Sequence, residues 1–219
     1  ASEMSFDHQV SEELLGDLCR IAVAGGSELA GAARILSEQP EKAATLFAPF
    51  IKAQEAVVVA GADKMGVDPK FLAFFLYHSL RPSFCSCAAR LADHLESSPS
   101  GEQGYCPVCG SPPAIAWIED QGQRYLFCSF CWHKWPVNRA LCPFCGNRGE
   151  EGLLYFYSEE EKEYRLDACP ACRRYVKAVD TRMLRRFGYP ALEQVASLHL
   201  DLKAVEAGYT AAAPTRLHD

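Results

Sequence analysis

Apolar residues recur at helical spacing through the first 97 residues, and this pattern predicts a helical domain. After Ser11, which suits an N-cap, apolar side chains follow at intervals of three and four until Gly25-Gly26. A longer apolar run over residues 43–59 predicts another helix, which we expect to close near Gly61.

A further helix is predicted to begin at Asp68-Pro69, where a capping residue precedes a proline at the first helical position. Proline removes a backbone donor and clashes with the preceding turn, so we expect Pro82 to interrupt this helix. One more helix is then predicted to start near Phe84. The whole region therefore predicts a bundle of four or five helices.

The pattern changes at residues 98–104, whose content of Ser, Pro and Gly is typical of a linker. Short apolar and aromatic runs follow, and they predict strands. These runs are residues 114–118, 124–127, 153–157 and 175–179. Helical spacing returns over residues 190–208. We expect the helix of this C-terminal segment, residues 181–210, to pack on the helical domain, and residues 211–219 to form a tail.

Eight of the eleven cysteines lie in four Cys-x-x-Cys pairs. The pairs are Cys106 and Cys109, Cys128 and Cys131, Cys142 and Cys145, and Cys169 and Cys172. The sequence Cys-Pro-x-Cys-Gly opens the first and third pairs, and each is followed by aromatic strand segments and a second pair. This internal repeat predicts two copies of one unit, residues 105–140 and 141–180.

Two Cys-x-x-Cys turns brought together make a tetrahedral four-sulfur site, which suits zinc or a single iron ion. Sequential pairing puts the first four cysteines at one site and the last four at the other. It leaves 18 and 23 residues between paired turns, whereas interleaved pairing would leave 32 and 37. Loop entropy changes slowly with length and does not exclude the interleaved alternative, but the repeat favours sequential pairing.

Such a closed site has no open position for a substrate, so a structural role is favoured over a redox or metal-exchange role. Gly110 and Gly146 follow the first turn of each site, whereas Trp132 and Arg173 take the same place in the second turns. A rubredoxin would have glycine in both turns, so the pattern fits a zinc ribbon at least as well. The metal, zinc or iron, stays open.

Charge and composition limit the classes of partner. The chain carries a net charge of −6, and residues 105–180 hold 9 basic and 10 acidic residues, which disfavours contact with nucleic-acid phosphates. The apolar runs are too short to span a membrane, and the polar, acidic start predicts no signal peptide. Many cysteines without such a signal favour a reducing compartment and metal binding. Cys19, Cys85 and Cys87 are expected to be small buried hydrophobes.

The motifs occur in the order CPVCGSPP, YLFCSFCWHKW, CPFCG, YRLDACPACRRYVK and LHLDLKAVEAGY. Over roughly residues 68–209 this order resembles the FdhE-type formate dehydrogenase accessory proteins. The resemblance implies a helical domain followed by two rubredoxin- or zinc-ribbon-like modules. It also implies a cytoplasmic protein that binds the catalytic subunit of formate dehydrogenase during maturation. The eight paired cysteines match the family's metal-binding motifs, and members have been associated with iron as well as zinc.

The resulting hypothesis is an α+β protein with a helical bundle over residues 1–97, two tandem ribbons and a C-terminal helix. It would hold two metal ions and act as an assembly factor without catalytic activity of its own. One alternative is a zinc-ribbon protein that binds nucleic acid. Another is a redox or electron-transfer protein that uses the four-sulfur sites.

Overall fold

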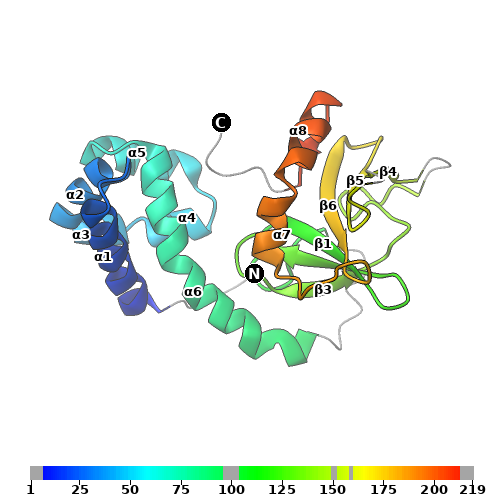
Figure 1. Ribbon diagram of the computed structural model, residues 1–219. Coiled ribbons are helices and arrows are strands. Elements are labelled where there is room, and N and C mark those ends of the chain that lie inside the picture. Colours follow the sequence, from blue (N-terminus) through cyan, green and yellow to red (C-terminus); the bar gives the residue numbers. More distant parts are fainter. Residues whose placement is uncertain (1–6, 96–103, 149–151, 158–159, 213–219) are drawn as a thin grey trace. The chain divides into compact units, whose positions relative to one another are not determined.

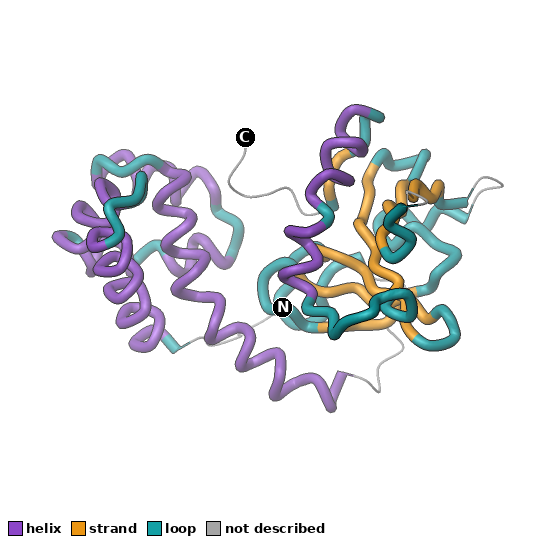
Figure 2. Tube along the Cα trace, in the orientation of Figure 1, coloured by secondary structure: helices purple, strands orange, loops and turns teal. Residues whose placement is uncertain are grey.

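The computed structural model describes residues 7–95, 104–148, 152–157 and 160–212. These residues form two compact units, and the division falls between Cys87 and Ala88. Figure 2 shows helices in the first unit and strands in the second. The predicted tail lies mostly outside the described residues, as does most of the linker, so the predicted domain boundaries stay predictions.

Helix α1 (His8–Ala24) begins four residues earlier than the pattern predicted. The N-cap is Asp7, whose Oδ1 accepts a hydrogen bond from the backbone amide of Val10 at 3.1 Å. Ser11 instead lies buried in the first turn, and its hydroxyl donates to the carbonyl of Asp7 at 2.9 Å. Gly25 is the C-cap, as expected.

The apolar run over residues 43–59 is not one helix, and this prediction was wrong. After α2 (Ala30–Glu38) the chain forms α3 (Pro40–Ala44), α4 (Phe47–Ile51) and α5 (Glu55–Met65). Ala53 adopts a φ of 53°, which a right-handed helix does not allow, so the chain breaks before α5. Helix α5 then passes Gly61 and ends at Gly66, whose φ is 72°.

Pro82 does not end a helix, because α6 runs without interruption over Pro69–Leu95. The start was predicted correctly, and Asp68 Oδ1 accepts a hydrogen bond from the amide of Lys70 at 2.8 Å. An internal proline costs a helix about 3 kcal/mol. Burial of side chains in the turns before Pro82, among them Phe75 and Leu80, offsets this cost.

The second unit contains a seven-stranded sheet with strand order β3-β2-β1-β6-β5-β4 (Figure 1), in which β7 also pairs with β6. The strands are β1 (Pro113–Glu119), β2 (Gln123–Cys128), β3 (Lys134–Val137), β4 (Leu154–Tyr157), β5 (Tyr164–Ala168), β6 (Arg174–Asp180) and β7 (Thr210–Ala211). Strands β1–β3 and β4–β6 each form an antiparallel ribbon. The predicted fold class is confirmed, although β3, β5 and β7 were not predicted.

The two ribbons share one sheet, because β1 and β6 pair in parallel with Ala116 opposite Ala178 and Trp117 opposite Val179. Both strands are almost entirely apolar between their ends, as expected for strands at the centre of a sheet. The sequence predicts two tandem ribbons, and this pairing joins their strands in one sheet.

The predicted C-terminal helix is two helices, α7 (Pro190–Ala196) and α8 (Leu198–Glu206), with Ser197 between them. Figure 1 shows both along the sheet, and they contact strands β1, β5, β6 and β7. Leu200 and Ala204 of α8 join the buried cluster that includes Leu166 and Val179. Packing on the helical domain stays a prediction.

Polar contacts fix the inner side of these helices. Glu193 is completely buried, and its carboxylate accepts hydrogen bonds from the Tyr164 hydroxyl at 2.6 Å and from Arg186 at 2.8 Å. Asp201 accepts from the Tyr175 hydroxyl at 2.8 Å and from Lys177 at 2.6 Å. The apolar side chains whose spacing predicted helix in this segment face away from the sheet, and they are Leu192, Val195, Leu198, Leu202 and Val205.

None of the described helices is both long and apolar enough to cross a membrane.

Candidate metal centres

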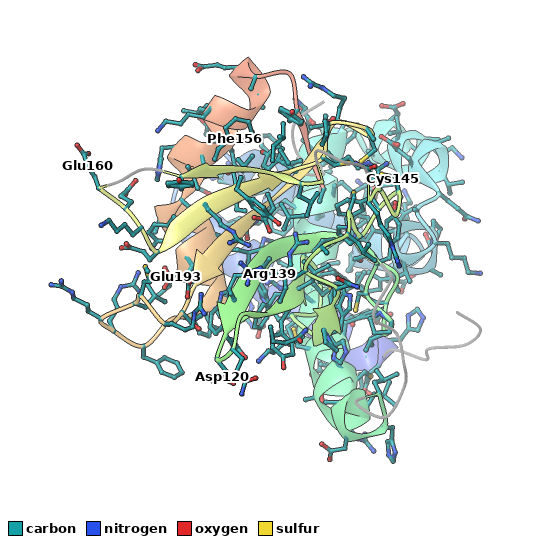
Figure 3. The ribbon with its side chains drawn as sticks, turned by 90° about the vertical axis from the view of Figure 1, so that its right-hand side faces the viewer. Asp120, Arg139, Cys145, Phe156, Glu160 and Glu193 are labelled. Carbon is teal, nitrogen blue, oxygen red and sulfur yellow. The ribbon has the colours of Figure 1, made fainter. Side chains whose placement is uncertain are left out.

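The eight paired cysteines form two clusters, and in each cluster all four sulfur atoms lie within 4.8 Å of one another. Cys106, Cys109, Cys128 and Cys131 form the first cluster, and Cys142, Cys145, Cys169 and Cys172 form the second. This grouping is that of sequential pairing, one cluster in each ribbon. Figure 3 places Cys145 on a loop beyond the ends of the strands.

The sulfur separations suit a tetrahedral metal ion. In the first cluster Cys106 and Cys109 each lie 3.6 Å from Cys131, and Cys109 lies 3.3 Å from Cys128. In the second, the pairs Cys142–Cys172 and Cys145–Cys169 are both 3.7 Å apart. A tetrahedron of zinc–sulfur bonds of about 2.3 Å has edges of about 3.8 Å. A disulfide would need about 2.05 Å. The donor set and its spacing therefore fit two four-sulfur metal sites.

The four turns share one backbone pattern. In each turn the amide of the first cysteine donates to the carbonyl of the residue five positions later. These bonds join Cys106 to Ser111, Cys128 to His133, Cys142 to Asn147, and Cys169 to Arg174, at 2.8–3.2 Å. The structural repeat therefore includes the second cysteine turn of each ribbon, although the sequence of that turn differs from that of the first.

The residue after each turn has a positive φ. Gly110 and Gly146 have φ values of 73° and 69°, and the side chains at the matching positions, Trp132 and Arg173, adopt 57° and 59°. A residue with a Cβ is strained there by about 1–2 kcal/mol. Arg173 offsets the strain by donating to the Ala207 carbonyl at 2.7 Å, and its guanidinium lies 4.0 Å from the ring centre of Tyr209. Sequence reasoning took these two residues as departures from the pattern.

Hydrogen bonds to sulfur favour a thiolate in each cluster. The thiol of Cys106, with those of its neighbours, lowers the pKa of Cys109. Burial raises the pKa of Cys169, but hydrogen bonds from the backbone amides of Cys172 and Ala171, together with those of the Cys142 and Cys145 side chains, lower it to about 7. The Cys106 contact raises the pKa of Cys131. Four negative sulfurs so close repel one another, and a dication removes that repulsion.

The two clusters differ in exposure. Cys106, Cys128 and Cys131 of the first are 3% exposed or less, and Cys109 is half-buried. In the second, Cys145 is exposed and Cys172 is half-buried. Of the other cysteines, Cys19 is buried as expected, whereas Cys85 and Cys87 on α6 are only half-buried.

The central part of the chain matches a described protein family. Residues 105–139 match the family described as the central domain of FdhE. A protein FdhE homolog of Aquifex aeolicus is 37% identical over 150 residues, which cover 66% of this chain and 51% of that protein. A protein FdhE homolog of Shewanella oneidensis is 26% identical over 169 residues, covering 76% and 52%. The chain therefore spans about half the length of these curated relatives.

A solved structure shares the fold. The crystal structure of the FdhE protein from Pseudomonas aeruginosa superposes with a TM-score of 0.59 at 19% sequence identity, covering 96% of both chains. At this identity the likeness supports the fold: a helical region, a sheet with two four-cysteine clusters, and C-terminal helices.

Proposed function

From its similarity to FdhE proteins, we propose that the chain is a cytoplasmic accessory protein that binds the catalytic subunit of a formate dehydrogenase. Binding would support the assembly or activation of that subunit. The protein would have no catalytic activity of its own. The order of the cysteine motifs and of the closing helical segment supports this proposal.

The observation that carries a binding role is the exposed apolar face of the two C-terminal helices. We call the five side chains on this face the apolar stripe: Leu192, Val195, Leu198, Leu202 and Val205. Each is between 55% and 68% exposed, although all five recur at helical spacing. Large apolar side chains that are exposed together on one helical segment favour a protein–protein interaction site. The stripe is therefore the surface we assign to the partner.

The metal sites would act as structural supports for that surface. Zinc or iron, when bound, would cross-link the two turns of each ribbon. Arg173, which follows the last cysteine turn, donates to the carbonyl of Ala207 at the end of α8. The second cluster is thereby linked to the helix that carries part of the stripe.

Co-purification from the native host tests the proposal. Tagged protein should retain the formate dehydrogenase catalytic subunit, and deletion of the gene should lower formate dehydrogenase activity while the amount of the subunit's transcript stays unchanged. Retention of no such subunit, together with full activity in the deletion strain, would contradict the proposal.

A further inference from the structure

We propose that the two metal sites have different roles: the first keeps its ion, and the second exchanges its ion with thiol ligands from outside the protein. This inference goes beyond the proposed function and does not depend on the partner. It rests on differences between positions that the internal repeat makes equivalent.

The first difference is the exposure of the second cysteine in each Cys-Pro-x-Cys turn. Cys109 and Cys145 occupy the same position in their turns, but Cys109 is half-buried and Cys145 is exposed. The exposed sulfur still belongs to the cluster, since it lies 3.7 Å from Cys169. An incoming ligand can therefore approach the second site from the Cys145 side without any opening of the sheet.

One of the residues between the two cysteines of each turn is also more buried at the first site than at the second. Val108 and Phe130, each directly before the second cysteine of its turn, are buried at the first site. The matching residues of the second site are Phe144, which is half-buried, and Ala171, which is exposed. Apolar cover around a metal site controls access of solvent. The second site has less of it, because its buried cluster contains Leu153 as its only aliphatic side chain among the described residues.

A cavity adjoins the second site. It has a volume of about 150 Å³, and its lining includes Cys142, Pro143, Gly146 and Arg148. Asn138 and Leu141, which connect the two ribbons, complete one wall. Its lining residues Cys142, Pro143 and Gly146 flank Cys145 in the chain, so the cavity provides space for a small thiol beside this turn.

The exchange is a ligand substitution without oxidation or reduction. An incoming thiol bonds to the ion through sulfur, and Cys145 Sγ gives up its bond to the ion. The proton of the incoming thiol passes to Cys145, so the charge of the site is unchanged. Repetition at the other cysteines transfers the ion to the incoming ligands.

Metal release tests the difference. The full chain, loaded with two equivalents of zinc, is mixed with an excess of the colorimetric chelator 4-(2-pyridylazo)resorcinol. We expect metal release in two phases of one equivalent each, with the rate of the faster phase about tenfold higher. Contacts around metal ligands typically change metal binding by about this factor. Release of both equivalents at one rate would overturn the inference.

Two matched variants assign the phases. Cys145→Ser should remove the fast equivalent and leave the slow one, and Cys109→Ser should remove the slow one. The opposite assignment would contradict the proposal. Alkylation of the zinc-loaded wild-type chain with iodoacetamide, followed by peptide mass mapping, gives a result even where a variant fails to fold. Among the eight ligands, Cys145 should be labelled first, and first labelling of Cys109 would refute the assignment.

Discussion

Arg124 on β2 and Asp167 on β5 form a buried ion pair, with Nη2 and Oδ2 3.1 Å apart and each side chain 1% exposed. The two residues come from different ribbons. Strands β2 and β5 are three positions apart in the sheet, which is about 14 Å on a flat sheet, so the sheet must curve to bring the side chains together. Arg165 also donates to Asp167, at 2.8 Å.

Breaking this pair should destabilise the sheet strongly. Arg124→Ala leaves the Asp167 carboxylate with only one partner in a dry environment, and we expect a loss of about 3–5 kcal/mol in the free energy of unfolding. The measurement is urea denaturation followed by tryptophan fluorescence. The exposed pair Lys134–Glu119 is the control, and Lys134→Ala should cost about 1 kcal/mol or less. Equal losses for the two variants would show that the buried pair does not join the ribbons.

Glu193 should make the attachment of α7 dependent on pH. Arg186 holds the pKa of Glu193 below its ordinary value, with a further contribution from Tyr164. A depressed carboxyl pKa stabilises the folded state above the unfolded pKa of about 4.3, and this stabilisation is lost as pH falls through the folded pKa. The denaturation midpoint of the wild type should therefore be higher than that of Glu193→Gln at pH 7. The two midpoints should converge at acid pH. A constant difference between them at every pH would contradict this explanation.

Removal of metal from the first site should unfold the first ribbon and spare the first unit. All three tryptophans, Trp117, Trp132 and Trp135, lie in the second unit, so their fluorescence reports on it alone. Structural zinc supplies about 10–16 kcal/mol of apparent binding free energy in small folds. Cys106→Ala should therefore lose one equivalent of metal and shift tryptophan emission to the red, while helical circular dichroism is largely kept. Cys87→Ala, outside both clusters, should keep both equivalents; normal metal content in the Cys106 variant would refute the site.

The strain at Arg173 can be measured by comparing two substitutions. Both Arg173→Ala and Arg173→Gly remove the contacts to Ala207 and Tyr209, but only glycine tolerates a φ of 59° without cost. The glycine variant should be more stable than the alanine variant by about 1–2 kcal/mol in chemical denaturation. Equal stabilities would mean that the turn relaxes when the side chain is shortened.

Local signals in the sequence predicted which cysteines lie together. The Cys-x-x-Cys spacing and the repeat determine which sulfurs meet, and the grouping of cysteines followed from them. The parallel pairing of Ala116 with Ala178 could not be predicted, because it joins residues far apart in the chain with no periodic signal for it. The continuation of α6 through Pro82 was not predicted, because burial of neighbouring side chains outweighs the tendency of proline to end a helix.

Periodicity predicted the C-terminal helices but not which of their side chains contact the sheet. Leu198 and Leu202 belong to the spacing that predicted a helix, and they are exposed, whereas the side chains that contact the sheet include Glu193 and Asp201. The partners of these carboxylates, Tyr164 and Tyr175, lie on strands distant in sequence. A hydrophobic pattern cannot show that a buried acid has a partner, so the face of the helices that contacts the sheet could not be predicted.

The apolar stripe should be needed for partner binding and not for folding. Leu198→Asp and Leu202→Asp place charges on side chains that are 55% and 68% exposed, so denaturation midpoints should stay close to wild type. Retention of the formate dehydrogenase catalytic subunit on the tagged protein should fall at least tenfold, because a charge would enter an apolar interface. Leu200→Asp is the matched control on the buried face of α8, and it should lose stability as well as binding. Full retention by both stripe variants would move the binding surface elsewhere on the molecule.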